Sequence, residues 1–442
     1  MNRNRILIGT AAAIVTAVVA VLGGAFGGGS GGVGARAQPT GHDKAALGSL
    51  LSGLAGNNTA AYVRRLEGRV ERRPDDASAL VLLGLAYQQR ARETGDPRFF
   101  SLSDRALRRG EASPATAGLA KTGLAALSVS RHRFAAALPL ARAALHADPS
   151  NGTAYGALGD ALLNLGQYRK AFAAYDKMAE LSPSVGSYGR VANAREVTGR
   201  PRAAMEPLRL ALTLDVPIRE YRAAAFVQLG NIAFNMGRLG QAQRDYAKAT
   251  AALPGYVQAQ AGLAHVAAER GDYGTGAALF ARVVDRLPLP QYVIWQGDTL
   301  RAAGREREAR RAYALVRATE RIQAANGVRT ELQTAIFDLD HGHGIRDALG
   351  RAREAYRLAP SIDAADGLAW ALERNGRCGD ALAYSRRALR LGTRDALKFF
   401  HRGMIERCLG RRDEARSWFQ RALSTNPYFS LLWVPVARRY AG

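Results

Sequence analysis

Apolar residues recur with a helical period between positions 153 and 183. In the first half of this stretch, residues three and four apart share one helix face, namely Tyr155, Leu158 and Leu162. The second half has a similar face, formed by Ala171, Tyr175 and Met178. Gly166 separates the two helices, and Pro183 ends the second because proline lacks an amide donor. Neither helix can bury its apolar stripe alone, so the pattern predicts a helix pair that packs against similar neighbours.

The same pattern returns along the chain with a period near 34 residues. Prolines occupy the unit-ending position at Pro149, Pro183, Pro217, Pro254, Pro288, Pro360 and Pro427. Apolar and glycine positions repeat with them, as in Phe226, Gly230, Gly237 and Tyr246, in Val293, Gly297, Gly304 and Tyr313, and in Phe399, Gly403, Gly410 and Phe419. Such a period predicts one elongated array of helix pairs, in which each unit contacts only its neighbours.

At these residues the chain resembles the tetratricopeptide repeat (TPR) family. The resemblance covers roughly residues 58–427 and implies an all-α, right-handed superhelical solenoid of about ten helix-turn-helix units. Residues 428–442 are expected to form a capping helix over the last unit, which has no successor to bury it. The chain departs from the family pattern around Gly95, at Thr393 where a unit-ending proline is expected, and after Gly304, where the helix runs long.

Residues 1–37 have a different composition. Arg3 and Arg5 precede a charge-free stretch from 6 to 26, and Ala35-Arg36-Ala37 has the small-x-small form of a signal-peptidase site. The segment is therefore an export signal or an N-terminal transmembrane anchor, and whether it is cleaved stays open. Either form predicts a body outside the cytoplasm, at the cell membrane or secreted, joined through a flexible linker at 38–57. An adaptor that faces the cytoplasm from the membrane is the alternative.

The chain carries a formal net charge of +24, and all but six of its 62 basic residues are arginine. These arginines are spread over the whole length and form no dense basic run. Scattered charges of this kind are typical of solvated helix faces, so no specific nucleic-acid partner is expected.

Motifs that carry catalysis are absent from the sequence. It contains no HExxH or CxxC, and its glycine-rich run at 23–34 lies beside the apolar segment rather than between a strand and a helix. We therefore expect a non-catalytic protein without a cofactor.

Two small clusters have alternative interpretations. Asp338, Asp340 and His341 could bind a metal ion, but they also suit a helix C-terminus that ends at a glycine turn, which is the interpretation we favour. Cys378 and Cys408 fall at the same edge of adjacent predicted units, so they form either a disulfide or two free thiols.

The family resemblance implies that the first helix of each unit lines a concave groove that binds a partner. Counting the inward positions gives a candidate groove of Asp160, Asn164, Asn193, Asn231, Phe234, Asn235, His265, Asp298, Arg301, Phe337, Trp370, Arg374, Phe400, Met404 and Arg407. The same count also gives Glu196, Gln258, Gln333, Asp366 and Glu373. Asparagine both donates and accepts hydrogen bonds, so it can pair with the backbone of an extended peptide. Trp370, Phe400 and Met404 are expected to form an apolar pocket for a side chain.

The sequence thus predicts a protein–protein interaction scaffold that binds a protein or peptide in its concave groove. The alternative is an accessory protein that binds a metal or small ligand through Asp338, Asp340 and His341. The pattern identifies neither the partner nor the oligomeric state.

Overall fold

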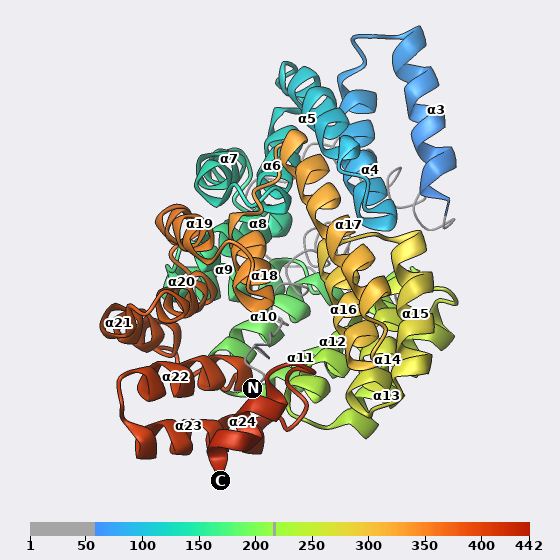
Figure 1. The fold of residues 1–442 in the computed structure, drawn as a ribbon. Helices are drawn as coiled ribbons and strands as arrows, with labels where there is room; N and C mark the ends of the chain where they lie inside the picture. Colours follow the sequence, from blue (N-terminus) through green and yellow to red (C-terminus); the bar gives the residue numbers. More distant parts are fainter. Residues whose placement is uncertain (1–57, 215–217) are drawn as a thin grey trace.

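The computed structural model describes residues 58–214 and 218–442, and within them the chain is all-helical (Figure 1). The expected all-α repeat fold is confirmed. Its helices are α3 (Thr59–Arg72), α4 (Ala77–Thr94), α5 (Arg98–Glu111), α6 (Ala117–Ser130), α7 (Phe134–Ala147), α8 (Gly152–Asn164), α9 (Tyr168–Leu181), α10 (Val185–Val197), α11 (Pro201–Ala211), α12 (Arg219–Asn235), α13 (Leu239–Ala252), α14 (Val257–Glu269), α15 (Tyr273–Arg286), α16 (Pro290–Ala302), α17 (Glu306–Ala325), α18 (Glu331–His341), α19 (Ile345–Leu358), α20 (Ile362–Arg374), α21 (Cys378–Ala388), α22 (Ala396–Cys408), α23 (Arg412–Thr425) and α24 (Val434–Ala441).

Twenty of these helices form ten consecutive pairs, from α4 with α5 to α22 with α23, which we number units 1 to 10. In the described part of the chain, the closest packing is within each pair, and successive pairs stack on one another. The helix α3 covers the first unit, and α24 packs against α23 at the other end. The sequence prediction of about ten units is therefore confirmed.

In four of the pairs, units 3, 5, 7 and 10, an aromatic ring of the second helix packs against a glycine of the first. A Cβ atom at Gly230 in α12 would lie 2.5 Å from Cε1 of Tyr246 in α13, and one at Gly403 would lie 2.6 Å from Cε1 of Phe419. Real Cβ atoms do not approach other atoms so closely, so only glycine allows the ring into this space. The repeating glycine and aromatic positions of the sequence therefore set the distance between the helices of these four pairs.

The superhelix returns to its own starting side, so that its second turn contacts its first. The loops between the two helices of units 1 to 5 contact the loops that follow units 6 to 10. We call this line of contacts the seam. Four of its hydrogen bonds join residues 192 to 197 positions apart. They are His132 Nδ1 with Arg329 O (2.8 Å), Ile362 N to Tyr168 Oη (2.6 Å), Thr393 Oγ1 to Val197 O (2.5 Å) and Asn426 Nδ2 to Phe234 O (3.0 Å).

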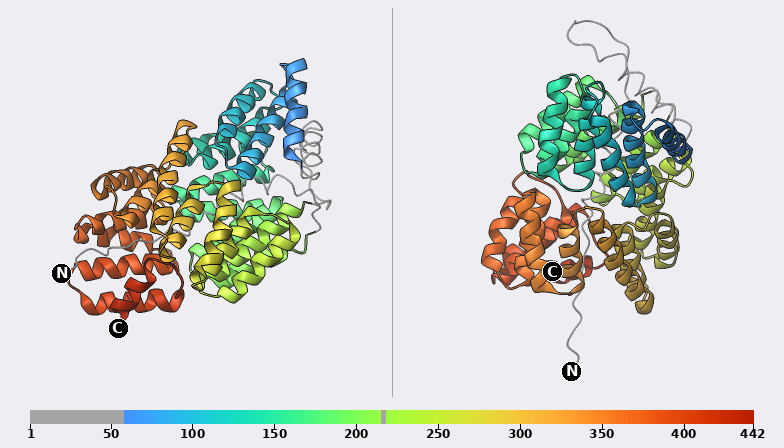
Figure 2. Two further views of the ribbon diagram at one scale, coloured as in Figure 1. Left: turned by 45° about the vertical axis from the view of Figure 1, so that its right-hand side comes forward. Right: turned by 90° about the horizontal axis from the view of Figure 1, so that it is seen from above.

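Figure 2 shows this arrangement, with the orange and red helices of the second half beside the cyan and green helices of the first. At the first contact of the seam, Leu287 lies against Gly95. The expectation that each unit contacts only its neighbours is therefore wrong. The pitch of the superhelix brings together units that are five apart in the chain.

The C-terminal end of the stack is closed by its own residues. Trp433, which directly precedes α24, is 2% exposed and packs with Phe399, Phe400 and Phe419 in the largest apolar core of the described residues. Cys378 at the start of α21 and Cys408 at the end of α22 are paired as a disulfide, with Cα atoms 6.0 Å apart. This distance is within the usual range for a disulfide, and the bond ties unit 9 to unit 10.

The predicted signal or anchor at 1–37 and the linker at 38–57 lie outside the described residues. Among the helices of 58–214 and 218–442, none combines the length and the apolar composition needed to cross a bilayer.

Candidate binding site inside the superhelix

The inner face of the superhelix encloses two cavities of about 260 and 190 Å³. They share lining residues, including Ser130, His132, Gln258, Tyr292, Trp295 and Ile336. The two cavities are therefore parts of one interior space, which we call the lumen. The larger cavity forms its polar end and the smaller one its apolar end. Because the seam is closed, both superhelical turns contribute to the walls of the polar end.

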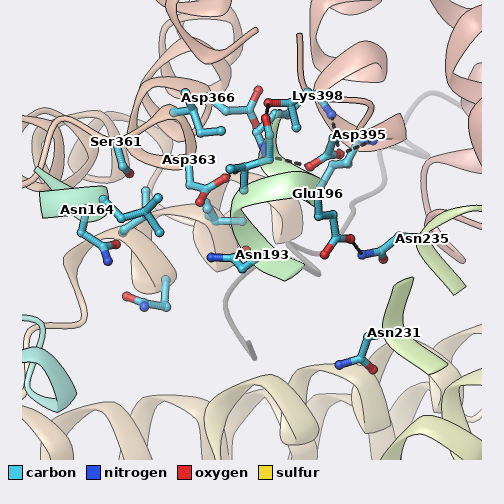
Figure 3. A pocket seen from close by; sticks show the side chains of 18 of the residues that line it. Asn164, Asn193, Glu196, Asn231, Asn235, Ser361, Asp363, Asp366, Asp395 and Lys398 are labelled. Carbon is cyan, nitrogen blue, oxygen red and sulfur yellow. Dashed lines mark hydrogen bonds and ion pairs between the residues drawn. The ribbon is translucent and has the colours of Figure 1, made fainter. Parts of the chain in front are cut away.

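Four of the predicted asparagines line the polar end, and Figure 3 shows them on the first superhelical turn. The Asn164 amide donates to Asp160 O within its own helix (2.9 Å), while Asn231 Oδ1 accepts from the hydroxyl of Tyr246 (2.8 Å). Asn193 makes no hydrogen bond to another described residue. The Asn193 amide, Asn164 Oδ1 and Asn231 Nδ2 are thus available to a ligand, which is the property expected of groove asparagines.

A group of carboxylates lines the same cavity as these amides. We call Glu196, Asp363, Asp366 and Asp395 the acidic cluster; all four line the larger cavity. Glu196 ends the inner face of α10, whereas the three aspartates come from α20 and from the N-cap of α22. The cluster therefore exists only because the seam brings unit 4 against units 9 and 10.

Lys398 neutralises part of the acidic cluster. Its ammonium lies 2.8 Å from Asp363 Oδ1 and 2.7 Å from Asp395 Oδ2. Burial disfavours the charged ammonium, but the two aspartates outweigh burial and raise the pKa of Lys398 well above its ordinary value. Lys398 is therefore positively charged and ion-paired with these two carboxylates.

The other two carboxylates have weaker partners. Asp366 Oδ2 lies 2.9 Å from His401 Nδ1, but its Oδ1 is buried and has no hydrogen-bond partner in the described structure. Glu196 Oε1 accepts a hydrogen bond from the Asn235 amide (2.8 Å), and the residue has no ion pair with a described basic group. Burial raises the pKa of Glu196, and the hydrogen bond from Asn235 lowers it only in part.

An aromatic stack separates the two ends of the lumen. The predicted groove residue His265 lies between Phe234 and Trp295, with ring centroids 4.4 and 4.6 Å away. Beyond Trp295, the smaller cavity is lined mainly by apolar side chains, among them Phe100, Leu289, Ile336 and the predicted Phe337. One end of the lumen is therefore suited to polar groups and the other to an apolar side chain.

Two predicted groove residues instead hold the units together. Asp160 is 4% exposed and accepts hydrogen bonds from Arg190 Nη2 (2.7 Å), from Arg190 Nε (2.9 Å) and from the Tyr175 hydroxyl (3.0 Å). Asp298 accepts a hydrogen bond from the Tyr313 hydroxyl (2.8 Å), and its Oδ1 lies 3.1 Å from His341 Nε2. Both carboxylates are buried and already paired, so the expectation that they face a partner is wrong.

The predicted apolar pocket at the C-terminal end is also wrong. Trp370 and Phe400 are both 0% exposed, and Met404 packs against the same core. Trp433 fills the space, edge-on to Trp370 (5.4 Å between centroids) and stacked on Phe400 (5.1 Å). The last unit has no successor, so its apolar inner face is covered by the chain that follows it.

The three predicted groove arginines contact neighbouring side chains and line neither cavity. The guanidinium of Arg374 lies over the Trp370 ring at 5.4 Å and that of Arg407 over Tyr440 at 4.1 Å. Arg301 Nε lies 3.8 Å from a carboxylate oxygen of Glu306.

The side chains of the metal candidates do not converge. Asp338 forms ion pairs with Arg317 and Arg351, and Asp340 accepts a hydrogen bond from Trp370 Nε1 (2.9 Å). His341 lies near Asp298 instead, and Gly342 ends α18 in the left-handed conformation, as the cap interpretation predicted. Within 58–214 and 218–442, no group of three or more His, Cys, Asp or Glu side chains could hold a metal ion.

The sequence analysis missed Asp363, Asp395 and Lys398. Asp363 is the second residue of α20, an inward position that the count along that unit could have included. Asp395 is the N-cap of α22, where its carboxylate accepts from the amides of Leu397 and Lys398, so its sequence signal is that of a cap. Only the superhelical pitch shows that these residues face Glu196.

A family model described as tetratricopeptide repeat matches three segments of the chain, residues 121–185, 227–289 and 367–428. Each segment contains two of the helix pairs described above, in whole or in large part. No curated protein matches the chain.

Solved structures with a similar arrangement include the APC/C hetero-tetramer Cut9–Hcn1, at 11% identity over 91% of this chain and 97% of that chain, with a TM-score of 0.33. The type IV pilus biogenesis factor PilW is 20% identical over 46% of this chain and 93% of its own, with a TM-score of 0.39. YrrB, a TPR protein with an unusual peptide-binding site, is 20% identical over 46% and 99%, with a TM-score of 0.29. At such TM-scores the similarity carries no information on function. The repeat pattern, the ten stacked helix pairs and the three family-model matches show that the chain belongs to the tetratricopeptide repeat family.

Proposed function

We propose that the protein is a non-catalytic scaffold that binds an extended segment of a partner protein in the lumen. One observation carries this proposal: amide groups of Asn164, Asn193 and Asn231 face the cavity from three consecutive units, and each keeps at least one hydrogen-bonding atom without a described partner. An amide can donate to a backbone carbonyl or accept from a backbone N–H, so a row of amides can hold a peptide without reading its sequence. Membership of a family of interaction scaffolds supports the same conclusion.

Site-specific photo-crosslinking in cells tests this proposal. A benzophenone side chain is placed at Asn193 on the lumen wall, and in a second variant at Asp413, whose side chain is 92% exposed on α23. We expect the Asn193 variant to crosslink to one recurrent partner segment, identified by mass spectrometry, and the Asp413 variant not to capture that segment. Equal capture of the segment at both positions would contradict binding inside the superhelix.

We further propose that residues 1–37 deliver the body to the outside of the cytoplasm, either secreted or held at the membrane. The basic start and the apolar stretch of that segment support export. The pairing of Cys378 with Cys408 supports it independently, because structural disulfides persist mainly in oxidising compartments. Protease added to intact cells should then digest the repeat body; full protection until the cells are lysed would favour the adaptor that faces the cytoplasm.

A further inference from the structure

The lumen has the opposite charge to the protein that encloses it. The whole chain has a formal net charge of +24, yet the polar end is lined by five carboxylates and only three basic side chains. The five are the acidic cluster and Glu331, and the three are Arg329, Arg394 and Lys398. A negatively lined cavity inside a strongly positive protein is not explained by average composition, so the carboxylates require a local reason.

The chain supplies too few cations of its own for this cluster. Lys398 is committed to Asp363 and Asp395, and Arg394 is an exposed residue at the rim. Glu196 has no ion pair with a described basic group. Asp366 is 7% exposed; its Oδ2 is paired with His401, but its Oδ1 has no hydrogen-bond partner. A buried carboxylate oxygen without a donor is costly, and a bound ligand with N–H donors would remove that cost.

The apolar end also contains a buried carboxylate oxygen without a hydrogen-bond partner. Glu320 lines the smaller cavity and is 7% exposed, and its Oε1 also lacks a hydrogen-bond partner. Its other carboxylate oxygen receives a long contact of 3.4 Å from Arg317. Two separate positions along the lumen therefore present an unsatisfied acceptor from a buried acid. They do not form a metal site, because no three ligands converge among the described residues.

We propose that the partner segment bound in the lumen is basic, and that a lysine or arginine side chain of it is held between Glu196 and the aspartates of the acidic cluster. This inference rests on the proposed scaffold function and specifies its partner. The row of asparagines holds the backbone of the segment, and the acidic cluster selects its side chain. Figure 3 shows Glu196 and Asp363 extending toward the cavity from opposite superhelical turns, so the cation contacts both.

A guanidinium or ammonium fits this position better than a neutral donor does. Each presents several N–H groups and a full positive charge, which matches carboxylates on opposite walls. The positive exterior repels a basic partner at long range, so recognition depends on contacts made inside the lumen.

The test uses the purified full chain and a positional-scanning library of acetylated, amidated hexapeptides. Pools with lysine or arginine fixed at one position should be retained at least about tenfold more than pools with glutamate fixed there, as expected for one charge-assisted contact. The best single peptide is then labelled and its Kd measured by fluorescence anisotropy. In Glu196→Gln/Asp363→Asn, this Kd should rise by about tenfold or more.

A matched control removes the same charge from the exterior. In Glu180→Gln/Asp413→Asn the altered side chains are 66% and 92% exposed, and the Kd should stay unchanged. Glutamine at 196 can still accept the hydrogen bond from Asn235, and circular dichroism and thermal melts verify that each variant folds.

The outcomes separate this inference from the proposed function. Retention of acidic or neutral pools that is lost in Asn193→Ala would overturn the basic partner and leave the scaffold intact. Retention of no pool would count against both. If free argininamide or spermidine binds as tightly as the best peptide, the site takes a small cation and the peptide assignment is wrong.

Discussion

The seam can be tested with two glycine substitutions that differ only in what lies beside them. Gly199 and Gly376 occupy the same place, the turn between the two helices of a unit, with φ angles of 76° and 75°. A Cβ atom at Gly199 would collide with the carbonyl oxygen of Gly392 across the seam, whereas one at Gly376 would meet nothing within 4 Å. Alanine at either position has the same backbone cost, so the comparison isolates the contact between superhelical turns.

The structure gives a magnitude for each variant. A left-handed conformation costs alanine about 1–2 kcal/mol relative to glycine, and this is the whole expected loss for Gly376→Ala. Gly199→Ala adds the cost of forcing an atom into a packed contact, about 1–3 kcal/mol. If the seam parts to avoid the collision, the hydrogen bond from Thr393 Oγ1 to Val197 O is lost instead, at about 1 kcal/mol.

Urea unfolding and small-angle X-ray scattering measure the two effects. We expect Gly199→Ala to lose about 1–3 kcal/mol more than Gly376→Ala and to have a larger maximum dimension as the second turn moves away. Amide exchange near 389–395 should accelerate only in Gly199→Ala. Equal destabilisation and identical scattering of the two variants would refute the argument, because the superhelical turns would then not be in contact in solution.

Three further predictions concern buried groups. Replacing Cys378 and Cys408 by serine should lower the unfolding free energy by about 3 kcal/mol, because the disulfide closes a loop with a sequence separation of 30; thiol titration of the non-reduced protein should find no free thiol. Asp160→Ala leaves Arg190 buried without its carboxylate and should cost about 3–5 kcal/mol by denaturant unfolding. Burial raises the pKa of Asp340 to about 7, so between about pH 4 and pH 7 the folded chain holds a proton that the unfolded chain has released. The unfolding free energy should therefore fall as the pH rises from about 4 to 7. Asp340→Asn should reduce this slope by up to about 1.4 kcal/mol per pH unit.

The repeat units were predictable because everything that defines them lies within 34 residues. Glycine and aromatic positions such as Gly230 and Tyr246 are 16 residues apart, and the proline that ends a unit is equally local. A pattern of this range specifies the helix pair and its packing on the next pair. The repeat pattern therefore predicts the fold and the number of units from the sequence alone.

The seam was not predictable in the same way. It depends on small rotations between successive units, which accumulate over five units before His132 reaches Arg329. No periodic position in the sequence indicates the accumulated rotation. The error about neighbouring units and the omission of Asp395 and Lys398 have this single origin, since both depend on what the second turn places opposite the first.

Residues at equivalent places in the repeat also have different environments. Asn193 in unit 4 and Trp370 in unit 9 both occupy inward positions of a first helix, yet the asparagine lines the lumen and the tryptophan is 0% exposed. Trp370 is covered because the chain after unit 10 folds back with Trp433 against it. Repeat position therefore identifies which residues face inward, and the end of the array determines which of these stay open.

The superhelical pitch that closes the seam also brings the side chains of both turns together in the lumen. Amides of Asn193 and Asn231 come from the first turn, and the carboxylates of Asp363 and Asp395 come from the second, so neither turn contains the complete site. Binding and closure are consequently linked: any change that separates the turns moves the carboxylates away from the amides. Gly199→Ala, which contacts no ligand, should therefore weaken a bound basic segment as well as the fold. Gly376→Ala should leave that affinity unchanged, because the turn it alters lies away from the seam.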